Sequence, residues 1–139
     1  MTPYETASRF FHACESLEGW AGCQQYVADN AEFSAQCEPL MDVNTVQAYC
    51  DWLAGLGGGP LNGCSYQLHS SAYDDPNNTA LFFGTFNGTH VGEGGPLPAT
   101  KQSTSTDYVY AITMNGAGKV SKMVKIWNAP WALRELGWM

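Results

Sequence analysis

Apolar side chains recur at helical spacing from the start of the chain, at Tyr4, Ala7, Phe10, Phe11, Cys14 and Leu17. This period places them on one face of an amphipathic helix. Thr2, with Glu5 three residues later, forms a capping-box pattern, and Pro3 suits the first turn of a helix. The sequence therefore predicts a helix that begins directly after Thr2.

Two more helices and one strand are expected before residue 61. A short helix covers residues 20–27, and weak alternation predicts a short strand over 31–36. Asn44 with Gln47 is a second capping-box pattern. It opens a helix with an apolar stripe at Val46, Tyr49, Leu53 and Leu56. The Gly-Gly-Gly-Pro run at 57–60 is typical of the end of a helix.

The apolar period then changes to two, which is typical of β-strands. Strands are expected over 65–73, 79–91, 101–114 and 119–127, with turns at 74–78 and 115–118, a Gly/Pro-rich loop at 92–99 and a short helix or turn at 130–136. This order predicts an α+β fold. Its curved antiparallel sheet wraps around the N-terminal helices and forms a cone with an internal pocket. All 139 residues are expected to form one domain.

The charge of the chain excludes two classes of partner. The formal net charge is −7, and no Lys or Arg occurs between Arg9 and Lys101. Nucleic-acid binding and adhesion to anionic lipid both need a basic surface, so neither partner is expected. No apolar run approaches the length of a membrane helix, and the N-terminus has neither the basic nor the apolar region of a signal peptide.

The cysteine count indicates reduced thiols. The chain has five cysteines, an odd number, and no pair has C-x-x-C spacing. Together with the missing signal, this predicts a cytoplasmic protein with free thiols. Three separated histidines without acidic partners at ligand spacing argue against a metal site. A thiol enzyme would need one cysteine with a lowered pKa, and no basic residue lies near the cysteines in sequence.

Four stretches in the second half of the chain have a distinctive pattern: the strand and loop from Gly84 to Glu93, the Pro98-Ala99-Thr100-Lys101 stretch, the Gly118-Lys119-Val120 hairpin and the final Lys125-Ile126-Trp127 strand. Together with the order of elements along nearly the whole chain, they resemble SnoaL-like polyketide cyclases, a family of the nuclear transport factor 2-like superfamily of α+β cones. Lys101 departs from the pattern, since the family usually has Gly there. The same superfamily contains isomerases and non-enzymatic binding domains.

The resemblance implies a cofactor-free reaction in which an aspartate and a histidine move protons. Asp107 is the expected general base, and His90 is expected to assist at the carbonyl oxygen. Asp107 would need to face the cone, where burial would raise its pKa. The alternative is that it faces solvent or pairs with Lys101, Lys122 or Lys125 across the sheet. His69 is expected to be exposed, and His12 to be a partly buried structural residue.

Aromatic residues are abundant, with 18 rings among 139 residues. Those expected to line the pocket around a hydrophobic, oxygenated small molecule are Trp20, Tyr26, Phe33, Trp52, Phe86, Tyr108, Tyr110 and Trp127. Ordinary core packing is the alternative for each ring. The tryptophans near the C-terminus are expected to pack over the sheet or against a second subunit, and the resemblance implies a homodimer. The leading hypothesis is a polyketide cyclase or isomerase. The alternative is a non-catalytic small-molecule-binding or dimerisation module with the same fold.

Overall fold

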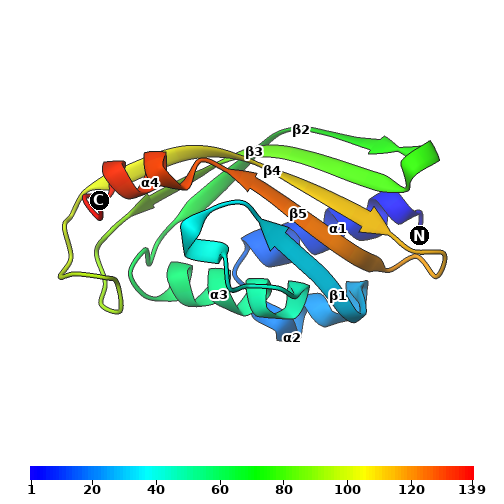
Figure 1. The fold of residues 1–139 in the computed structure, drawn as a ribbon, viewed down its shortest axis with the longest axis horizontal. Coiled ribbons are helices and arrows are strands. Elements are labelled where there is room, and N and C mark those ends of the chain that lie inside the picture. Colours follow the sequence, from blue (N-terminus) through cyan, green and yellow to red (C-terminus); the bar gives the residue numbers. More distant parts are fainter.

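A five-stranded sheet curves over three N-terminal helices in the computed structural model, which describes residues 1–139 (Figure 1). The helices are α1 (Pro3–Glu15), α2 (Gly19–Cys23) and α3 (Val46–Gly58), and they lie together on the concave side of the sheet. A short helix, α4 (Ala129–Glu135), closes one end of the molecule. The predicted α+β cone is confirmed.

The strands follow the order β1-β5-β4-β3-β2 across the sheet. Their bounds are β1 Val27–Ala35, β2 Ser65–Asp74, β3 Thr79–Thr89, β4 Ser103–Met114 and β5 Val120–Trp127. The four C-terminal strands pair antiparallel in sequence order, as expected. β1 joins the edge of the sheet by pairing parallel to β5, so the sheet is mixed rather than wholly antiparallel.

The helix caps follow the sequence in one case and differ in the other. The Thr2 hydroxyl accepts a hydrogen bond from the Glu5 backbone N–H at 3.1 Å, as predicted. At α3 the cap is Thr45, which accepts from the Ala48 N–H, and not Asn44. Two potential caps stand side by side here, and the one in extended conformation directly before the first turn holds the position.

A bulge in β2 changes which face of the strand is buried. His69 is the extra residue, because Leu68 pairs with Gly84 and Ser70 pairs with Phe83. Tyr66 and Leu68 face the helices before the bulge, and Tyr73 faces them after it. The simple alternation expected over the whole of residues 65–73 is therefore wrong beyond Leu68.

The core lies between the concave sheet face and the helices. Its largest fully buried side chains include Phe10, Phe11, Tyr49, Phe82 and Tyr110. Phe11 of α1 stacks on Phe82 of β3 with 4.8 Å between ring centroids. These rings fill the space between the sheet and the helices, and a pocket remains toward α4.

Candidate functional site

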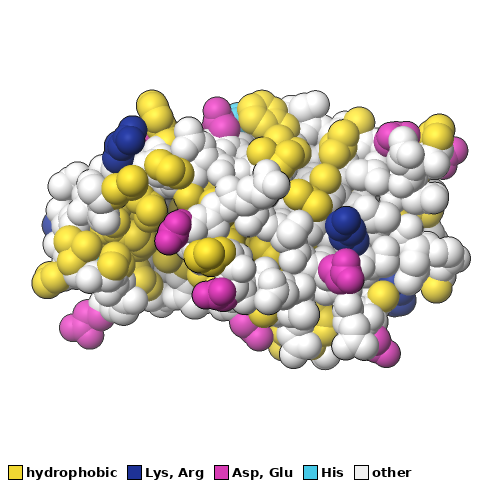
Figure 2. All heavy atoms as spheres, in the orientation of Figure 1, with side chains coloured by type: hydrophobic (Ala, Val, Ile, Leu, Met, Phe, Trp, Pro, Cys, Tyr) yellow, Lys and Arg dark blue, Asp and Glu magenta, His cyan; other side chains and the backbone are white.

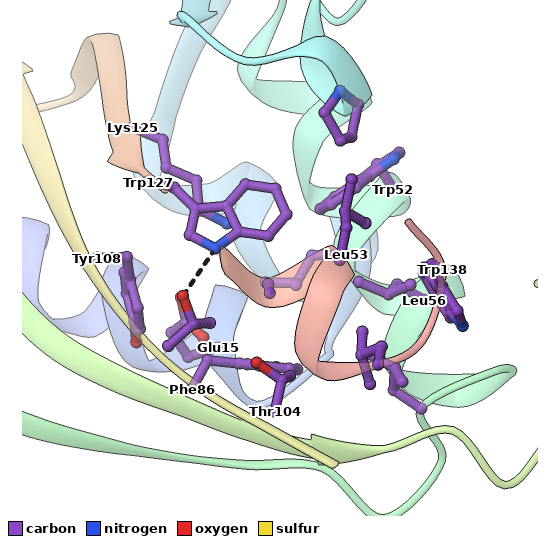
Figure 3. A pocket seen from close by; sticks show the side chains of 16 residues that line it. Glu15, Trp52, Leu53, Leu56, Phe86, Thr104, Tyr108, Lys125, Trp127 and Trp138 are labelled. Carbon is purple, nitrogen blue, oxygen red and sulfur yellow. Dashed lines mark hydrogen bonds between the residues drawn. The ribbon is translucent and has the colours of Figure 1, made fainter. Parts of the chain in front are cut away.

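A pocket lies between α3, the sheet and the C-terminal segment (Figure 3). Most of its lining is apolar, from Leu53 and Leu56 of α3 to Leu136 and Trp138 near the C-terminus. Its ionisable side chains are Glu15, Tyr108 and Lys125. In Figure 3 these three lie on one side of the pocket, with Leu56 and Trp138 on the other. The pocket thus has one polar wall and one apolar wall.

Glu15 is the last residue of α1 and is only 7% exposed. It stands four residues after Phe11, so the helix turns its side chain toward the core. Burial raises the pKa of the Glu15 carboxyl, while the positive charge of Lys125 and the hydroxyls of Tyr110 and Tyr108 act in the lowering direction. A carboxyl of this kind can hold or release a proton nearer neutral pH than an exposed one.

Lys125 brings the balancing charge from β5 and is 8% exposed. Its Nζ donates a hydrogen bond of 3.0 Å to the Tyr49 hydroxyl. Five aromatic rings surround the ammonium, with centroids between 4.6 Å (Trp127) and 5.9 Å (Tyr110) from Nζ. Burial lowers the pKa of Lys125, and the carboxylate of Glu15 acts to raise it. The aromatic cage and Glu15 together hold a cation inside the fold.

Tyr108 presents an unused polar atom. Its hydroxyl oxygen is buried near enough to the Glu15 carboxyl to affect its pKa, but it has no partner within hydrogen-bond distance and geometry. Buried polar groups are rarely left unpaired, so such a group in a cavity wall is available to a ligand. Burial and the charge of Glu15 raise the pKa of Tyr108, which keeps the phenol protonated and able to donate. The neighbouring Trp127 Nε1 is already satisfied, since it donates to the Thr106 hydroxyl at 3.2 Å.

The C-terminal segment covers the pocket. Ala132, Leu133, Leu136 and Trp138 form part of the lining. Glu135 fixes α4 to β4, because its carboxylate accepts from the Thr104 hydroxyl at 2.8 Å and from the Ser105 N–H at 2.9 Å. The space in the pocket is about 60 Å³, well below the ~300 Å³ and upward of most ligand sites. In this conformation the C-terminal segment therefore leaves the pocket closed to a ligand of ordinary size.

Hydrophobic side chains also gather outside the pocket at this end. Figure 2 shows them near α4 and the loop that follows β3. Leu97 and Trp131 are exposed large hydrophobic residues in these segments. The surface beside the closed pocket is therefore apolar as well.

The prediction that Asp107 faces the cone is wrong. Asp107 is exposed on the outer face of β4, because Thr106 and Tyr108 on either side of it point inward. Its carboxylate accepts from the Thr85 hydroxyl at 2.7 Å, and Thr85 Oγ1 lies 2.7 Å from His69 Nε2. Asp107 thus takes the solvent-facing alternative, with a threonine rather than a lysine as its partner. His69 is exposed, as expected.

His90 forms no hydrogen bond with Asp107 and does not line the pocket. It is fully buried just beyond β3. Its Nδ1 accepts hydrogen bonds from the Thr100 N–H at 3.2 Å and from Trp138 Nε1 at 2.8 Å. The expected Asp107–His90 pair does not form, and His90 instead ties the C-terminal segment to the loop after β3. His12 is exposed rather than partly buried, and its Nδ1 lies 2.8 Å from the Tyr66 hydroxyl.

Half of the predicted aromatic lining is found in the pocket: Trp52, Phe86, Tyr108 and Trp127. The prediction is wrong for the other four. Phe33 and Tyr110 are buried in the core, and Tyr26 packs against it. Trp20 belongs to a different hollow beside β1.

Glu15 and Lys125 were not expected in the site, although each carries a sequence signal. Glu15 continues the apolar face of α1, and Lys125 stands between Met123 and Trp127 on the inward-facing side of β5. A charged residue at a position where the hydrophobic periodicity predicts a buried side chain is the sequence signal for a buried charge.

The thiols lie apart from the pocket. All five cysteines are free, and none lines the pocket. Hydrogen bonds from Cys14 and Cys50 act to lower the pKa of Cys23, against the raising effect of burial. The Cys23 side chain is nevertheless fully buried, so it is not placed to act on a substrate in this conformation.

Comparison with known proteins reveals likeness in structure. No protein-family model and no curated protein matches the sequence. A candidate SnoaL-like polyketide cyclase from Jannaschia sp. CCS1 has a TM-score of 0.78 at 13% identity over 96% of this chain and 90% of that one. IdmH, a candidate polyketide cyclase from Streptomyces antibioticus, has a TM-score of 0.75 at 12% identity over 99% of both chains.

An NTF2-like protein from Burkholderia thailandensis E264 has a TM-score of 0.70 at 16% identity, over 94% of both chains. None of the helices in the structure has the length and hydropathy needed to cross a membrane. At these identities the likeness concerns the fold. The chain therefore has the α+β cone fold of SnoaL-like and NTF2-like proteins.

Proposed function

We propose that the protein is a cofactor-independent acid–base enzyme that enolises a small carbonyl compound with an apolar body. One observation carries the proposal: a buried carboxyl, a buried ammonium and a partnerless phenol line the same apolar pocket, from Glu15, Lys125 and Tyr108. Groups with shifted pKa values in a hydrophobic pocket are typical of active sites. The fold shared with polyketide cyclases supports the same class of reaction.

The proposed reaction divides the proton transfers between two groups. The Glu15 carboxylate removes a proton from the carbon next to the carbonyl, and the electron pair of that C–H bond forms the enolate. The Tyr108 O–H donates a hydrogen bond to the oxygen on which negative charge develops. Lys125 supplies positive charge near both groups, and low solvent access makes that charge effective.

The fate of the enolate then decides the product. Return of the proton from Glu15 to a different carbon of the conjugated system gives an isomer. Attack of the enolate carbon on a second carbonyl of the same molecule closes a ring, and the alkoxide formed takes up a proton. Both outcomes conserve atoms and need no external oxidant. The names of the structural neighbours favour ring closure of a polyketide.

Substrate entry requires the C-terminal segment to move. A space of about 60 Å³ is too small for a ring-forming substrate. The cover consists of α4 and the residues after it, which are held by hydrogen bonds of Glu135, His90, Thr100 and Trp131. Opening of this cover is therefore part of the proposal, and closure would exclude water from the enolate.

The closed pocket also favours a second candidate, a non-catalytic module that binds a small apolar molecule. In this case Lys125 and Glu15 serve to orient the ligand, and no proton leaves carbon. The two candidates differ in one measurable event, which is exchange of the proton next to the carbonyl.

The test follows that exchange by NMR in D2O with a panel of cyclic ketones and polycyclic keto-esters. Glu15→Gln is expected to slow the exchange by roughly 10²–10⁴-fold, the usual contribution of a general base. Asp107→Asn is the matched control, since this carboxyl lies on the outer face, and it is expected to retain the wild-type rate. Equal exchange by wild type and Glu15→Gln overturns the proposal. Tight binding without any exchange favours the binding module.

The pH dependence of the exchange rate gives a second readout. The base must be ionised, and burial raises the pKa of Glu15 above its ordinary value of 4.5. The rate is therefore expected to fall as pH decreases through this raised pKa, and the fall begins at a higher pH than it would for an exposed carboxyl. Glu15→Gln is expected to remove this acid limb, and an unchanged limb in the variant would assign it to another group.

A further inference from the structure

Three cysteines from three different helices meet inside the core. Cys14 lies in α1, Cys23 ends α2, and Cys50 lies in α3. Their sulfur atoms are all within 4.8 Å of one another, and the Sγ atoms of Cys14 and Cys50 are 3.9 Å apart. Each side chain is at most 1% exposed. The cluster is separate from the pocket, so the proposed function leaves it unexplained.

The spacing fits three sulfur ligands around one ion. Bonds of about 2.3 Å from three sulfurs to one ion place the sulfurs about 4.0 Å apart in a planar site and about 3.5 Å apart in the pyramidal site of an ion with a lone pair. The Cys14–Cys50 distance of 3.9 Å is close to this range, so inward shifts of a few tenths of an ångström for these two sulfurs and a larger one for Cys23 complete the site. No His, Asp or Glu joins the three thiols within the same distance, so a fourth protein ligand for tetrahedral zinc is not in place.

The surrounding charges favour a complex without net charge. The Asp51 carboxylate lies beside the cluster, next to Cys50 in sequence and 2.9 Å from the Trp20 N–H of α2. Three thiolates around a divalent ion leave one buried negative charge, and around Cu(I) they leave two. Either charge would be desolvated and repelled by the nearby carboxylate. Three thiolates around a trivalent ion form a neutral unit, which burial does not penalise.

We propose that Cys14, Cys23 and Cys50 form a binding site for a trivalent, three-coordinate thiophilic ion, with arsenic(III) as the representative. Arsenous acid is neutral at physiological pH, and binding exchanges its three hydroxyls for three sulfurs. Three As–O bonds and three S–H bonds break, three As–S bonds form, and three water molecules leave. No oxidation state changes, and no charge enters or leaves the core.

Entry to the site requires a local opening. The cluster is closed to solvent, and α2 has only five residues, so its displacement is the least costly way to expose Cys23. The bound ion would then link α1, α2 and α3. Binding is therefore expected to be slow and stabilising, and a low concentration of urea is expected to accelerate it.

The experiment adds arsenite to the full chain kept reduced by a phosphine. A 1:1 complex with three As–S bonds is expected from native mass spectrometry and X-ray absorption, with two of the five thiols still free after rapid denaturation. The melting temperature is expected to rise by about 10 °C at a hundredfold excess over Kd. Cadmium(II) is expected to bind more weakly than arsenite, because its complex is charged.

Single variants assign the ligands. Cys23→Ser is expected to reduce arsenite affinity at least hundredfold, whereas Cys37→Ser and Cys64→Ser, which alter the two half-buried cysteines outside the cluster, are the matched controls. An absorption spectrum with two sulfur ligands, or equal loss of affinity in the control variants, overturns the proposal. The spectrum of the wild-type complex decides the coordination number even if Cys23→Ser does not fold. Cadmium binding tighter than arsenite overturns the argument from neutrality.

Discussion

Replacing Lys125 by methionine tests whether a buried charge pair organises the pocket. Methionine retains the unbranched shape of the lysine side chain and removes its charge. The variant loses the hydrogen bond to the Tyr49 hydroxyl and the contact of a cation with five rings. It also removes the cost of keeping an ammonium out of water, which amounts to several kcal/mol. For the lysine considered alone, these contributions offset to within about 1 kcal/mol.

The remaining effect acts through Glu15 and depends on pH. Burial raises the pKa of Glu15 above 4.5, and Lys125 limits that rise. Without the lysine, the folded state holds the proton to a still higher pH, while the unfolded state releases it near 4.5. The stability of the variant therefore falls as pH increases from the unfolded-state pKa of Glu15 to its folded-state pKa, and it falls no further above the folded-state pKa. We expect Lys125→Met to cost about 3 kcal/mol at pH 8, the usual result of leaving a buried charge unpaired.

The balance changes at pH 4. Glu15 is then mostly protonated in both the folded and the unfolded state, so it contributes little to the difference in stability. The wild type now carries a buried ammonium without its counter-charge, whereas Lys125→Met does not. We expect the variant to be as stable as the wild type at pH 4, within about 1 kcal/mol, or more stable.

Urea denaturation at the two pH values measures the difference. Lys122→Met, at an exposed position of the same strand, is the control and is expected to change stability by less than about 0.5 kcal/mol. The double variant Glu15→Gln/Lys125→Met is expected to remove the pH dependence of the Lys125 effect. An equal loss at pH 4 and pH 8 would refute the reasoning, because it would assign the role of Lys125 to packing and hydrogen bonding.

Two further variants test the packing behind Tyr108 and the attachment of the C-terminal segment. Gly84→Ala places a Cβ 2.7 Å from a backbone oxygen of β2 and 3.1 Å from the Tyr108 hydroxyl, so urea denaturation is expected to show a loss of stability of about 2 kcal/mol. Gly58→Ala is the control, because its Cβ meets nothing within 4 Å and no loss of stability is expected. His90→Phe removes the acceptor for the Trp138 indole N–H, so stability is expected to fall by about 1–3 kcal/mol and acrylamide is expected to quench Trp138 fluorescence more strongly. Unchanged stability and quenching would contradict the view that His90 holds the C-terminal segment in place.

Local patterns in the sequence predict most of the fold. The cap at Thr2, the stripe of α1 and the alternation of β4 are each determined by residues close together in the chain. Boundaries are less certain where two signals compete. The helix expected over residues 20–27 is α-helical only to Cys23, because the chain tightens into a 3-10 turn over Gln24–Tyr26 before β1 begins at Val27.

The site is less predictable, since side-chain direction decides it. Asp107 has the chemistry that the resemblance implies, but it stands at an outward-facing position of β4. A shift of one residue along a strand changes the face of the sheet on which a side chain lies, so a family motif alone does not identify the carboxyl that enters the pocket. Glu15 stands on the inward-facing side of α1, and only the tertiary contacts show that it lines the same pocket as Lys125.

The α+β class, the four antiparallel strands and the abundance of aromatic rings can be predicted from the sequence, because they depend on local period and composition. The tertiary structure decided which polar groups share the pocket, how β1 pairs, and how three cysteines from separate helices meet. Glu15 and Lys125 are 110 positions apart, and no local rule relates residues at that separation. Their proximity follows from the packing of α1 against a curved sheet, which forces two charged side chains into the same apolar space.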